Sequence, residues 1–128
     1  MTLFGDSVVE AMRRLFVILV NNAVKYTPDG GQIDVRLEAG AEWAIVRVTD
    51  TGIGIADKDL PHIFDRFWRA DKVRSRGMGG AGLGLSIARW ISDRHQWSIN
   101  ARAMPGGGTQ FTVTIPLVTV EKAAGLET

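Results

Sequence analysis

The strongest constraint on the fold is a strand-like run that ends in a carboxylate followed by two glycines. Residues 43–49 read Trp-Ala-Ile-Val-Arg-Val-Thr, and Asp50 follows directly, ahead of Gly52 and Gly54. Because side chains alternate between the two faces of a strand, Asp50 shares the face of Val48. If that face is the core, the carboxylate points inward, where an unpaired charge is costly. A hydrogen-bond donor for Asp50 is therefore expected; the alternative is an ordinary turn with a solvated aspartate.

Length and composition fit one domain with a hydrophobic core. Of the 128 residues, 45% are hydrophobic and 23% are charged, and the formal net charge is +1. This charge favours neither nucleic acid nor an anionic surface as a partner. The absence of cysteine excludes disulfides and thiolate metal sites and suits the cytosol. The longest apolar run, residues 15–20, is too short to cross a bilayer, and no signal peptide is recognised at Met1.

An amphipathic helix is predicted near the amino end. Ser7 and Glu10 form a capping-box pattern that predicts its start. Its apolar stripe reaches Asn22 and then Tyr26, and Lys25 lies about one turn beyond Asn22. Asn22 is thus a polar side chain on the apolar face, and the alternative is that it caps carbonyl groups at the helix end. Lys25 alone is more simply explained as a solvated lysine that complements the helix dipole.

Alternating apolar residues predict the strands. After a short edge strand at residues 2–4, they are a half-buried strand at 33–37 and strands at 43–49, 97–101 and 109–115. Asp57 is expected to cap a short helix, and a glycine-rich turn at 80 opens a helix to 94. The pattern predicts an α/β (α+β) two-layer sandwich, a mixed, mainly antiparallel sheet of about five strands with about three helices on one face. Residues 1–117 form this domain, and residues 118–128 are a frayed tail.

Two segments between the predicted helices stand out. Residues 69–80 have no periodicity and are rich in arginine, lysine and glycine, so they are predicted to form a mobile lid. Phe64, Phe67 and Trp68 form an aromatic cluster, which is ordinarily part of the core and otherwise an exposed patch for a partner.

Other phosphate-binding motifs and zinc sites are excluded. No Gly-x-x-x-x-Gly-Lys-[Ser/Thr] segment occurs, so the chain has no P-loop. Gly77, Gly79 and Gly82 have the spacing of the dinucleotide fingerprint, but they follow the basic lid rather than a strand. Neither His62 nor His95 has a partner histidine at zinc spacing, and both are interpreted as surface or packing residues.

Five motifs, taken in order, resemble the catalytic and ATP-binding domain of bacterial sensor histidine kinases, which belongs to the GHKL superfamily and has the Bergerat-type fold. They are the asparagine box at residues 22–28 (Asn-Ala-Val-Lys-Tyr-Thr-Pro), the first glycine box at 50–55, the phenylalanine box at 63–67, the second glycine box at 80–85 and the third at 106–111. The resemblance covers roughly residues 3–117. Each motif alone is weak, whereas five in this order and spacing are specific.

The resemblance implies a site for ATP and Mg²⁺. Asp50 would accept a hydrogen bond from the adenine amino group and so disfavour guanine, and Thr109 would complete the adenine contacts. Asn22 would hold Mg²⁺, a hard cation, through its side-chain oxygen, and Lys25 would contact phosphate; these two are the implied catalytic residues. The other implied nucleotide-binding residues are Tyr26, Gly52, Gly54, Ile55, Gly80, Gly82, Leu83, Gly84, Leu85 and a lid arginine, Arg76 or else Arg74.

Two positions depart from the family pattern. The hydrolytic members of the superfamily carry a water-activating glutamate where this chain has Ile18. An isoleucine cannot act as a base, which favours phosphoryl transfer over hydrolysis and leaves one contact to metal or water unfilled. Ala81 stands where many relatives have threonine or serine, so a modest affinity is expected.

The phosphoacceptor of a histidine kinase is not recognised in this sequence, because neither His62 nor His95 is followed by an acidic residue. The resemblance therefore implies a catalytic domain that presents the γ-phosphate to a histidine on a separate dimerisation domain, met through Phe64, Phe67 and Trp68. A response regulator would be an indirect partner. The expected location is cytoplasmic, whether or not the parent protein is anchored in the inner membrane, with no contact to membrane or nucleic acid. The alternatives are an anti-sigma-type serine kinase of the same superfamily and a degenerate, non-catalytic nucleotide-binding module.

Overall fold

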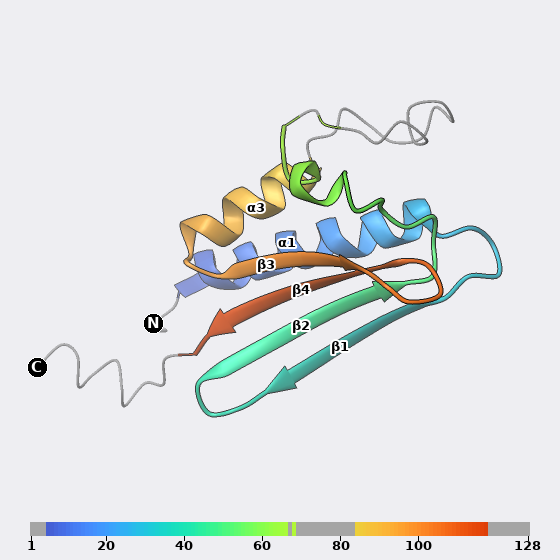
Figure 1. Ribbon diagram of the computed structural model, residues 1–128. Coiled ribbons are helices and arrows are strands. Elements are labelled where there is room, and N and C mark those ends of the chain that lie inside the picture. Colours follow the sequence, from blue (N-terminus) through green and yellow to red (C-terminus); the bar gives the residue numbers. More distant parts are fainter. Residues whose placement is uncertain (1–4, 67, 69–83, 118–128) are drawn as a thin grey trace, which may run out of the picture.

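Among the residues that the structure describes, two α-helices cover one face of a four-stranded sheet (Figure 1). The computed structural model describes residues 5–66, 68 and 84–117. Its elements are α1 (Gly5–Tyr26), β1 (Ile33–Ala39), β2 (Trp43–Asp50), the 3-10 helix η1 (Leu60–His62), α3 (Gly84–Arg94), β3 (Ser98–Ala103) and β4 (Thr109–Pro116). The strand order is β1-β2-β4-β3, and every neighbouring pair is antiparallel. This confirms the predicted two-layer α+β sandwich.

The counts of elements differ from the prediction. The described residues form four strands, all antiparallel, rather than about five in a mixed sheet. The edge strand predicted at residues 2–4, the lid at 69–80 and the tail at 118–128 lie outside the described residues. No helix within the described part of the chain is long and apolar enough to cross a membrane.

Two predicted helix starts are wrong. Gly5 and Asp6 already belong to α1, so Ser7 lies inside the helix, whereas an N-cap residue has a non-helical backbone. The helix predicted to begin at Asp57 is only the single 3-10 turn η1, and Asp59 precedes it without a side-chain cap. Pro61 lies in that turn and donates no backbone hydrogen bond.

The core lies between the two helices and the inner face of β2 and β4. Leu15, Leu19 and Ala23, spaced four residues apart on α1, are buried against it. Val48 of β2 and Phe111 of β4 are opposite each other in the register and are both buried. These contacts hold the carboxyl end of α1 close to the end of β2.

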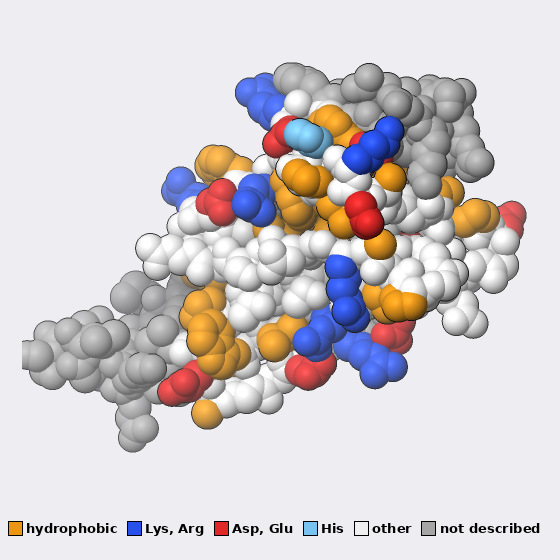
Figure 2. All heavy atoms as spheres, in the orientation of Figure 1, with side chains coloured by type: hydrophobic (Ala, Val, Ile, Leu, Met, Phe, Trp, Pro, Cys, Tyr) orange, Lys and Arg blue, Asp and Glu red, His pale blue; other side chains and the backbone are white. Residues whose placement is uncertain are grey.

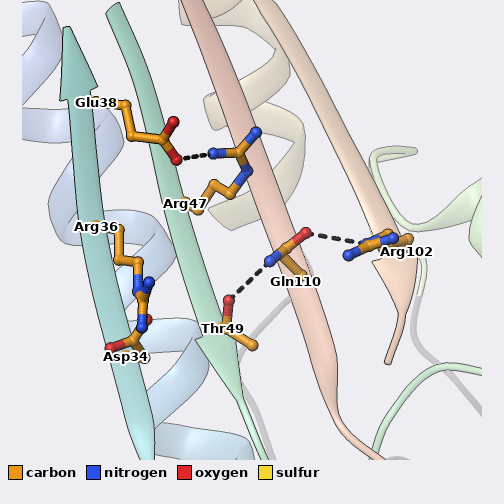
Figure 3. A network of polar contacts seen from close by, with 7 residues as sticks. All are labelled: Asp34, Arg36, Glu38, Arg47, Thr49, Arg102 and Gln110. Atoms are coloured by element: carbon orange, nitrogen blue, oxygen red, sulfur yellow. Dashed lines mark hydrogen bonds and ion pairs between the residues drawn. The ribbon is translucent and has the colours of Figure 1, made fainter. Parts of the chain in front are cut away.

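The sheet surface carries many charged side chains, with hydrophobic ones among them (Figure 2). Arg36 and Arg47 lie directly opposite each other on β1 and β2, an unfavourable pair of like charges. Each turns to an acid on β1 instead: Arg36 to Asp34 at 2.7 Å, and Arg47 to Glu38 (Figure 3). Further hydrogen bonds continue this network to the far edge, from Gln110 to Thr49 and from Arg102 to Gln110.

Strand β1 is exposed on both faces, so the prediction of a half-buried strand is wrong. Val35 and Leu37 point to the side of the sheet that carries the helices, yet they are 42% and 69% exposed. The reason is position, because β1 forms one edge of the sheet while α1 packs over β2 and α3 packs beside β3.

Candidate functional site

Asp50 is the last residue of β2, and it is only 5% exposed. Its position on the inner face of the sheet confirms the prediction from strand alternation. Its Oδ1 atom accepts hydrogen bonds from the backbone N–H groups of Gly52, at 2.8 Å, and Thr109, at 3.3 Å. The backbone of the protein itself therefore supplies Oδ1 with the hydrogen-bond donors expected for this carboxylate. No hydrogen bond from the described residues reaches Oδ2, so this oxygen can still accept one.

Thr109 lies directly opposite Asp50 at the start of β4, and it is also buried. The turn before it approaches β2 closely at Gly108, which has a φ of +93°. A Cβ atom on Gly108 would lie 1.9 Å from the backbone oxygen of Asp50. Only glycine fits there, and its presence lets Thr109 reach the carboxylate.

The carboxyl end of α1 is tied to the loop that follows Asp50. The backbone N–H of Ile53 donates to the carbonyl oxygen of Tyr26 at 3.1 Å. A Cβ atom on Gly52 would lie 2.2 Å from that same oxygen, so a side chain there would separate the two segments. Gly54 has a φ of +73°, which glycine tolerates at little cost. Gly52 thus serves the close contact between the loop and α1, whereas Gly54 lies beside Gly108, whose backbone nitrogen would be 3.6 Å from a Cβ atom at Gly54.

The last turns of α1 carry three of the predicted site residues. Asn22 and Tyr26 are half-buried on the side of the helix that faces the protein. Lys25 is exposed, and its Nζ atom lies 5.6 Å from the centroid of the Tyr26 ring. Asn22 is therefore a polar side chain on the half-buried side of the helix, whereas Lys25 is exposed to solvent.

The amino end of α3 packs beside α1 just before this region. Its first residue is Gly84, where a Cβ atom would lie 3.7 Å from the Ile18 side chain, one turn before Asn22. A helix amino end presents unpaired N–H groups and a positive dipole, which favour an anion. Ile55 and Leu85 are half-buried and pack against the core nearby. The other predicted residues of this segment, Gly80, Gly82, Leu83, Arg74 and Arg76, lie outside the described residues.

The residues described here do not form a protein-only metal site. Among them no group of three or more histidine, cysteine or acidic residues could hold an ion together. Asn22 offers one amide oxygen, which is a hard ligand. This donor set fits Mg²⁺ bound mainly through phosphate oxygens and water, the usual arrangement at nucleotide sites.

Two further residues belong to the site region and were not singled out from the sequence. The Thr27 hydroxyl is buried and has no hydrogen-bond partner among the described residues. Gly31 approaches it so closely that a Cβ atom would lie 2.4 Å from the Thr27 methyl group. The Pro-Asp-Gly-Gly sequence at residues 28–31 is typical of a turn, but it does not indicate this packing.

The aromatic cluster is mainly part of the core. Phe64 packs edge-to-face on Phe111 with ring centroids 6.2 Å apart, and the Arg89 guanidinium lies 5.3 Å from the Phe64 ring. Trp68 is partly buried against the same core. Phe67 lies outside the described residues. This packing is the ordinary explanation of such a cluster, and for Phe64 it leaves little surface for a partner.

The histidines have the packing and surface roles predicted for them. His95 stacks on Trp97 with ring centroids 4.8 Å apart, and His62 lies 3.2 Å from the carboxylate of Asp65. Neither lies among the residues gathered around Asp50.

Comparison with known proteins gives a consistent result. The sequence profile described as "Histidine kinase-, DNA gyrase B-, and HSP90-like ATPase" matches residues 7–119. The sensor histidine kinase RppB of Synechocystis sp. is 44% identical over 107 residues, which cover 84% of this chain but 24% of RppB. The chain thus spans about a quarter of the length of this curated relative.

Solved structures share the fold. The mycobacterial sensor histidine kinase MprB superimposes with a TM-score of 0.76 at 32% identity, covering 88% of this chain and 74% of that one. Full-length ShkA in complex with AMPPNP superimposes with a TM-score of 0.73 at 28% identity, covering 86% of this chain and 22% of ShkA. RppB and MprB are sensor histidine kinases, so the comparisons do not favour an anti-sigma-type serine kinase.

Proposed function

Because the chain belongs to the family of histidine kinase-, DNA gyrase B- and HSP90-like ATPases, we propose that it is the ATP-binding catalytic domain of a two-component sensor histidine kinase. It binds ATP with Mg²⁺ and presents the γ-phosphate to a histidine on a separate dimerisation domain. The histidine then passes the phosphoryl group to a response regulator, and the reaction takes place in the cytoplasm.

The adenine base is recognised at the end of β2. Oδ1 of Asp50 is held by the N–H groups of Gly52 and Thr109, so the orientation of the carboxylate is fixed before a ligand arrives. Oδ2 then accepts a hydrogen bond from the adenine amino group. The guanine carbonyl at the same position cannot donate one, so the site selects ATP over GTP. The Thr109 hydroxyl and the backbone at Gly54 and Ile55 complete the contacts with the base.

The phosphates lie between the carboxyl end of α1 and the amino end of α3. Asn22 supplies the protein ligand of Mg²⁺, Lys25 contacts phosphate, and Tyr26 flanks the nucleotide. The bound ion neutralises charge on the phosphates. Phosphoryl transfer needs mainly positioning and electrostatic stabilisation, so a fixed amide oxygen, a lysine and a helix amino end form a sufficient set. Further backbone and side-chain contacts come from Gly80, Gly82, Leu83, Gly84, Leu85 and Arg76.

One observation supports transfer over hydrolysis. Ile18 lies one turn before Asn22, partly buried against the core and close to the first residue of α3. The hydrolytic members of the superfamily carry a glutamate at this position that activates water. An isoleucine at this junction of α1 and α3 neither abstracts a proton nor orders a water molecule. The nucleotide is therefore kept intact until an external acceptor arrives.

The acceptor domain meets the catalytic domain near the aromatic cluster. Since Phe64 packs on Phe111, the contact falls mainly on Trp68 and Phe67. The two domains bind each other weakly when they are separate. In one protein, covalent linkage raises their effective concentration, so a weak contact is enough.

A titration with AMPPNP, an ATP analogue, tests Mg²⁺-dependent binding. We expect binding that is stronger with Mg²⁺ than with EDTA, and we expect Asn22→Ala to abolish this difference, because it removes the amide oxygen that holds the ion. Asn100→Ala, at an exposed position on β3, is the matched control and should behave like the unmodified chain. Isothermal calorimetry gives both dissociation constants. No binding, or Mg²⁺-dependence that survives Asn22→Ala, would contradict the proposal.

A phosphorylation assay tests the acceptor. With labelled ATP, we expect no phosphorylation of the chain alone and acid-labile label on an added histidine-containing dimerisation domain of the parent kinase. Acid-stable label on a serine would indicate the anti-sigma-type kinase instead. ATP binding without any transfer would indicate a degenerate module.

A further inference from the structure

Three polar side chains join β2, β4 and β3 on the outer face of the sheet, which is turned away from the helices. The Gln110 amide nitrogen donates to the Thr49 hydroxyl at 3.1 Å, and Nε of Arg102 donates to the Gln110 amide oxygen at 2.9 Å (Figure 3). Thr49 immediately precedes Asp50, and Gln110 immediately follows Thr109. We call these three side chains the Gln110 bridge, and it lies on the opposite face of the sheet from the Asp50 carboxylate.

The partners of Gln110 fix the direction in which its amide points. An arginine side chain only donates hydrogen bonds, so Arg102 holds the amide oxygen and turns the NH₂ group towards Thr49. The Thr49 hydroxyl accepts from that group. Arg102 lies directly opposite Gln110 in the register of β3 and β4, and Thr49 lies directly opposite Gln110 in the register of β2 and β4. The bridge therefore crosses three strands at one level of the sheet.

Side chains supply the link between β2 and β4 at this level. At the other end of the same pair of strands, the Leu117 N–H donates to the Glu42 carbonyl oxygen. Because hydrogen-bonded residues alternate along an antiparallel pair, the even-numbered residues of β2 bond to the β4 backbone. Thr49 and Gln110 belong to the other kind of pair, in which the two backbones exchange no hydrogen bonds and the side chains lie closer together.

The start of β4 depends on such a link because the turn before it is permissive. Gly106, Gly107 and Gly108 have φ values of +87°, +110° and +93°. Three consecutive glycines restrict the backbone little, so the turn alone does not fix the position of Thr109. The Thr109 N–H donates to Oδ1 of Asp50 over 3.3 Å, at the long end of the range for a hydrogen bond. A small outward shift of Thr109 therefore breaks this contact.

We propose that Gln110 is a positioning residue for recognition of the adenine base. The Gln110 bridge holds the start of β4 against the end of β2 and so keeps the Thr109 N–H on Oδ1 of Asp50. With Oδ1 held, Oδ2 keeps the direction that the adenine amino group requires. Gln110 and Thr49 act through Asp50, since their own side chains lie on the outer face. This inference rests on the proposed function, because it concerns the same adenine site.

Two substitutions of Thr49 separate positioning from stability. Thr49→Val removes the hydroxyl but keeps the β-branched shape that favours a strand, so the domain should stay at least as stable in urea. Its affinity for AMPPNP should fall roughly three- to tenfold, comparable to the contribution of one hydrogen bond. Thr49→Ser keeps the hydroxyl but favours a strand less, so it should be less stable and still bind AMPPNP like the unmodified chain. A role in stability alone predicts the reverse order of affinities.

Thr114→Val is the matched control. It makes the same chemical change on the same face of the sheet, but Thr114 lies opposite Ile45, towards the other end of β2 from Asp50. Its affinity for AMPPNP should equal that of the unmodified chain. Gln110→Met, which removes both hydrogen bonds at a similar side-chain length, should weaken binding as Thr49→Val does. The double variant Thr49→Val/Gln110→Met should bind no more weakly than the weaker of the two single variants, because both remove the same link.

The backbone amide proton of Thr109 reports the effect without a nucleotide. A hydrogen bond to a carboxylate moves an amide proton resonance downfield. In NMR spectra of the full chain, the Thr109 resonance should therefore move upfield in Thr49→Val and stay in place in Thr49→Ser and Thr114→Val.

The two measurements distinguish a failure of this inference from a failure of the proposed function. If the unmodified chain binds no AMPPNP, the proposed function is wrong, and the Thr109 resonance alone then supports or overturns the positioning of Thr109 by the bridge. If the unmodified chain binds AMPPNP, equal affinity in Thr49→Val overturns the inference. A Thr109 resonance that does not move in Thr49→Val overturns it in either case.

Discussion

Asp50→Asn should weaken the binding of ATP by about 1–3 kcal/mol, roughly 5- to 150-fold in Kd, without unfolding the domain. The N–H groups of Gly52 and Thr109 both donate to Oδ1. They will hold the oxygen of the new amide in the same place, so its NH₂ group must take the position of Oδ2. Two donors, the amide and the adenine amino group, then face each other, and the base loses its hydrogen bond.

The same substitution should improve the binding of GTP relative to ATP. The guanine carbonyl can accept from the new amide, whereas it meets only an oxygen in the unmodified chain. Calorimetric titration with non-hydrolysable analogues of both nucleotides measures the change. Asp93→Asn on α3, an exposed aspartate away from β2, is the control and should leave both affinities unchanged. Equal ATP binding by Asp50→Asn and the unmodified chain would contradict the assignment of Asp50 to adenine.

The inward position of Asp50 followed from the sequence, whereas its hydrogen bonds did not. Strand alternation is a local property, so the residues from 43 to 50 were enough to place the carboxylate on the core face. The second donor, the N–H of Thr109, comes from 59 residues further along the chain. It depends on how close the turn at Gly108 comes to β2, and no local pattern contains that distance.

The exposure of β1 is a second property that the local sequence pattern did not predict. Alternation correctly grouped Ile33, Val35 and Leu37 on one face, and their register against β2 places that face on the helix side. Alternation cannot indicate whether a helix covers the face, because that depends on the widths of the two layers. The helices lie over the other strands, and the side chains of β1 remain exposed. The sequence pattern also predicted too long a helix after Asp57. Pro61 and the turns around it allow only one 3-10 turn.

Gly108→Ala should lower the free energy of unfolding by about 3 kcal/mol or more, since strain and overlap act together. An alanine would hold an unfavourable φ of +93°, and its Cβ atom would lie 1.9 Å from the Asp50 carbonyl oxygen. To relieve this overlap the turn must move away from β2, and the Thr109 N–H then leaves Oδ1. Urea denaturation followed by circular dichroism measures the loss, and AMPPNP binding should weaken in parallel under conditions where the domain is still folded.

Gly106→Ala separates the effect of the unfavourable backbone conformation from the effect of the atomic overlap. Gly106 has a similar φ of +87°, but a Cβ atom there meets nothing within 4 Å. Its cost should therefore be that of the backbone conformation alone, about 1–2 kcal/mol, with unchanged affinity for the nucleotide. If both substitutions destabilise the chain equally, the close approach of the turn to Asp50 contributes nothing, and the second donor to Oδ1 is not needed to hold the carboxylate. A larger loss at Gly108, together with weaker binding, would instead link the packing of the glycine turn to recognition of the base.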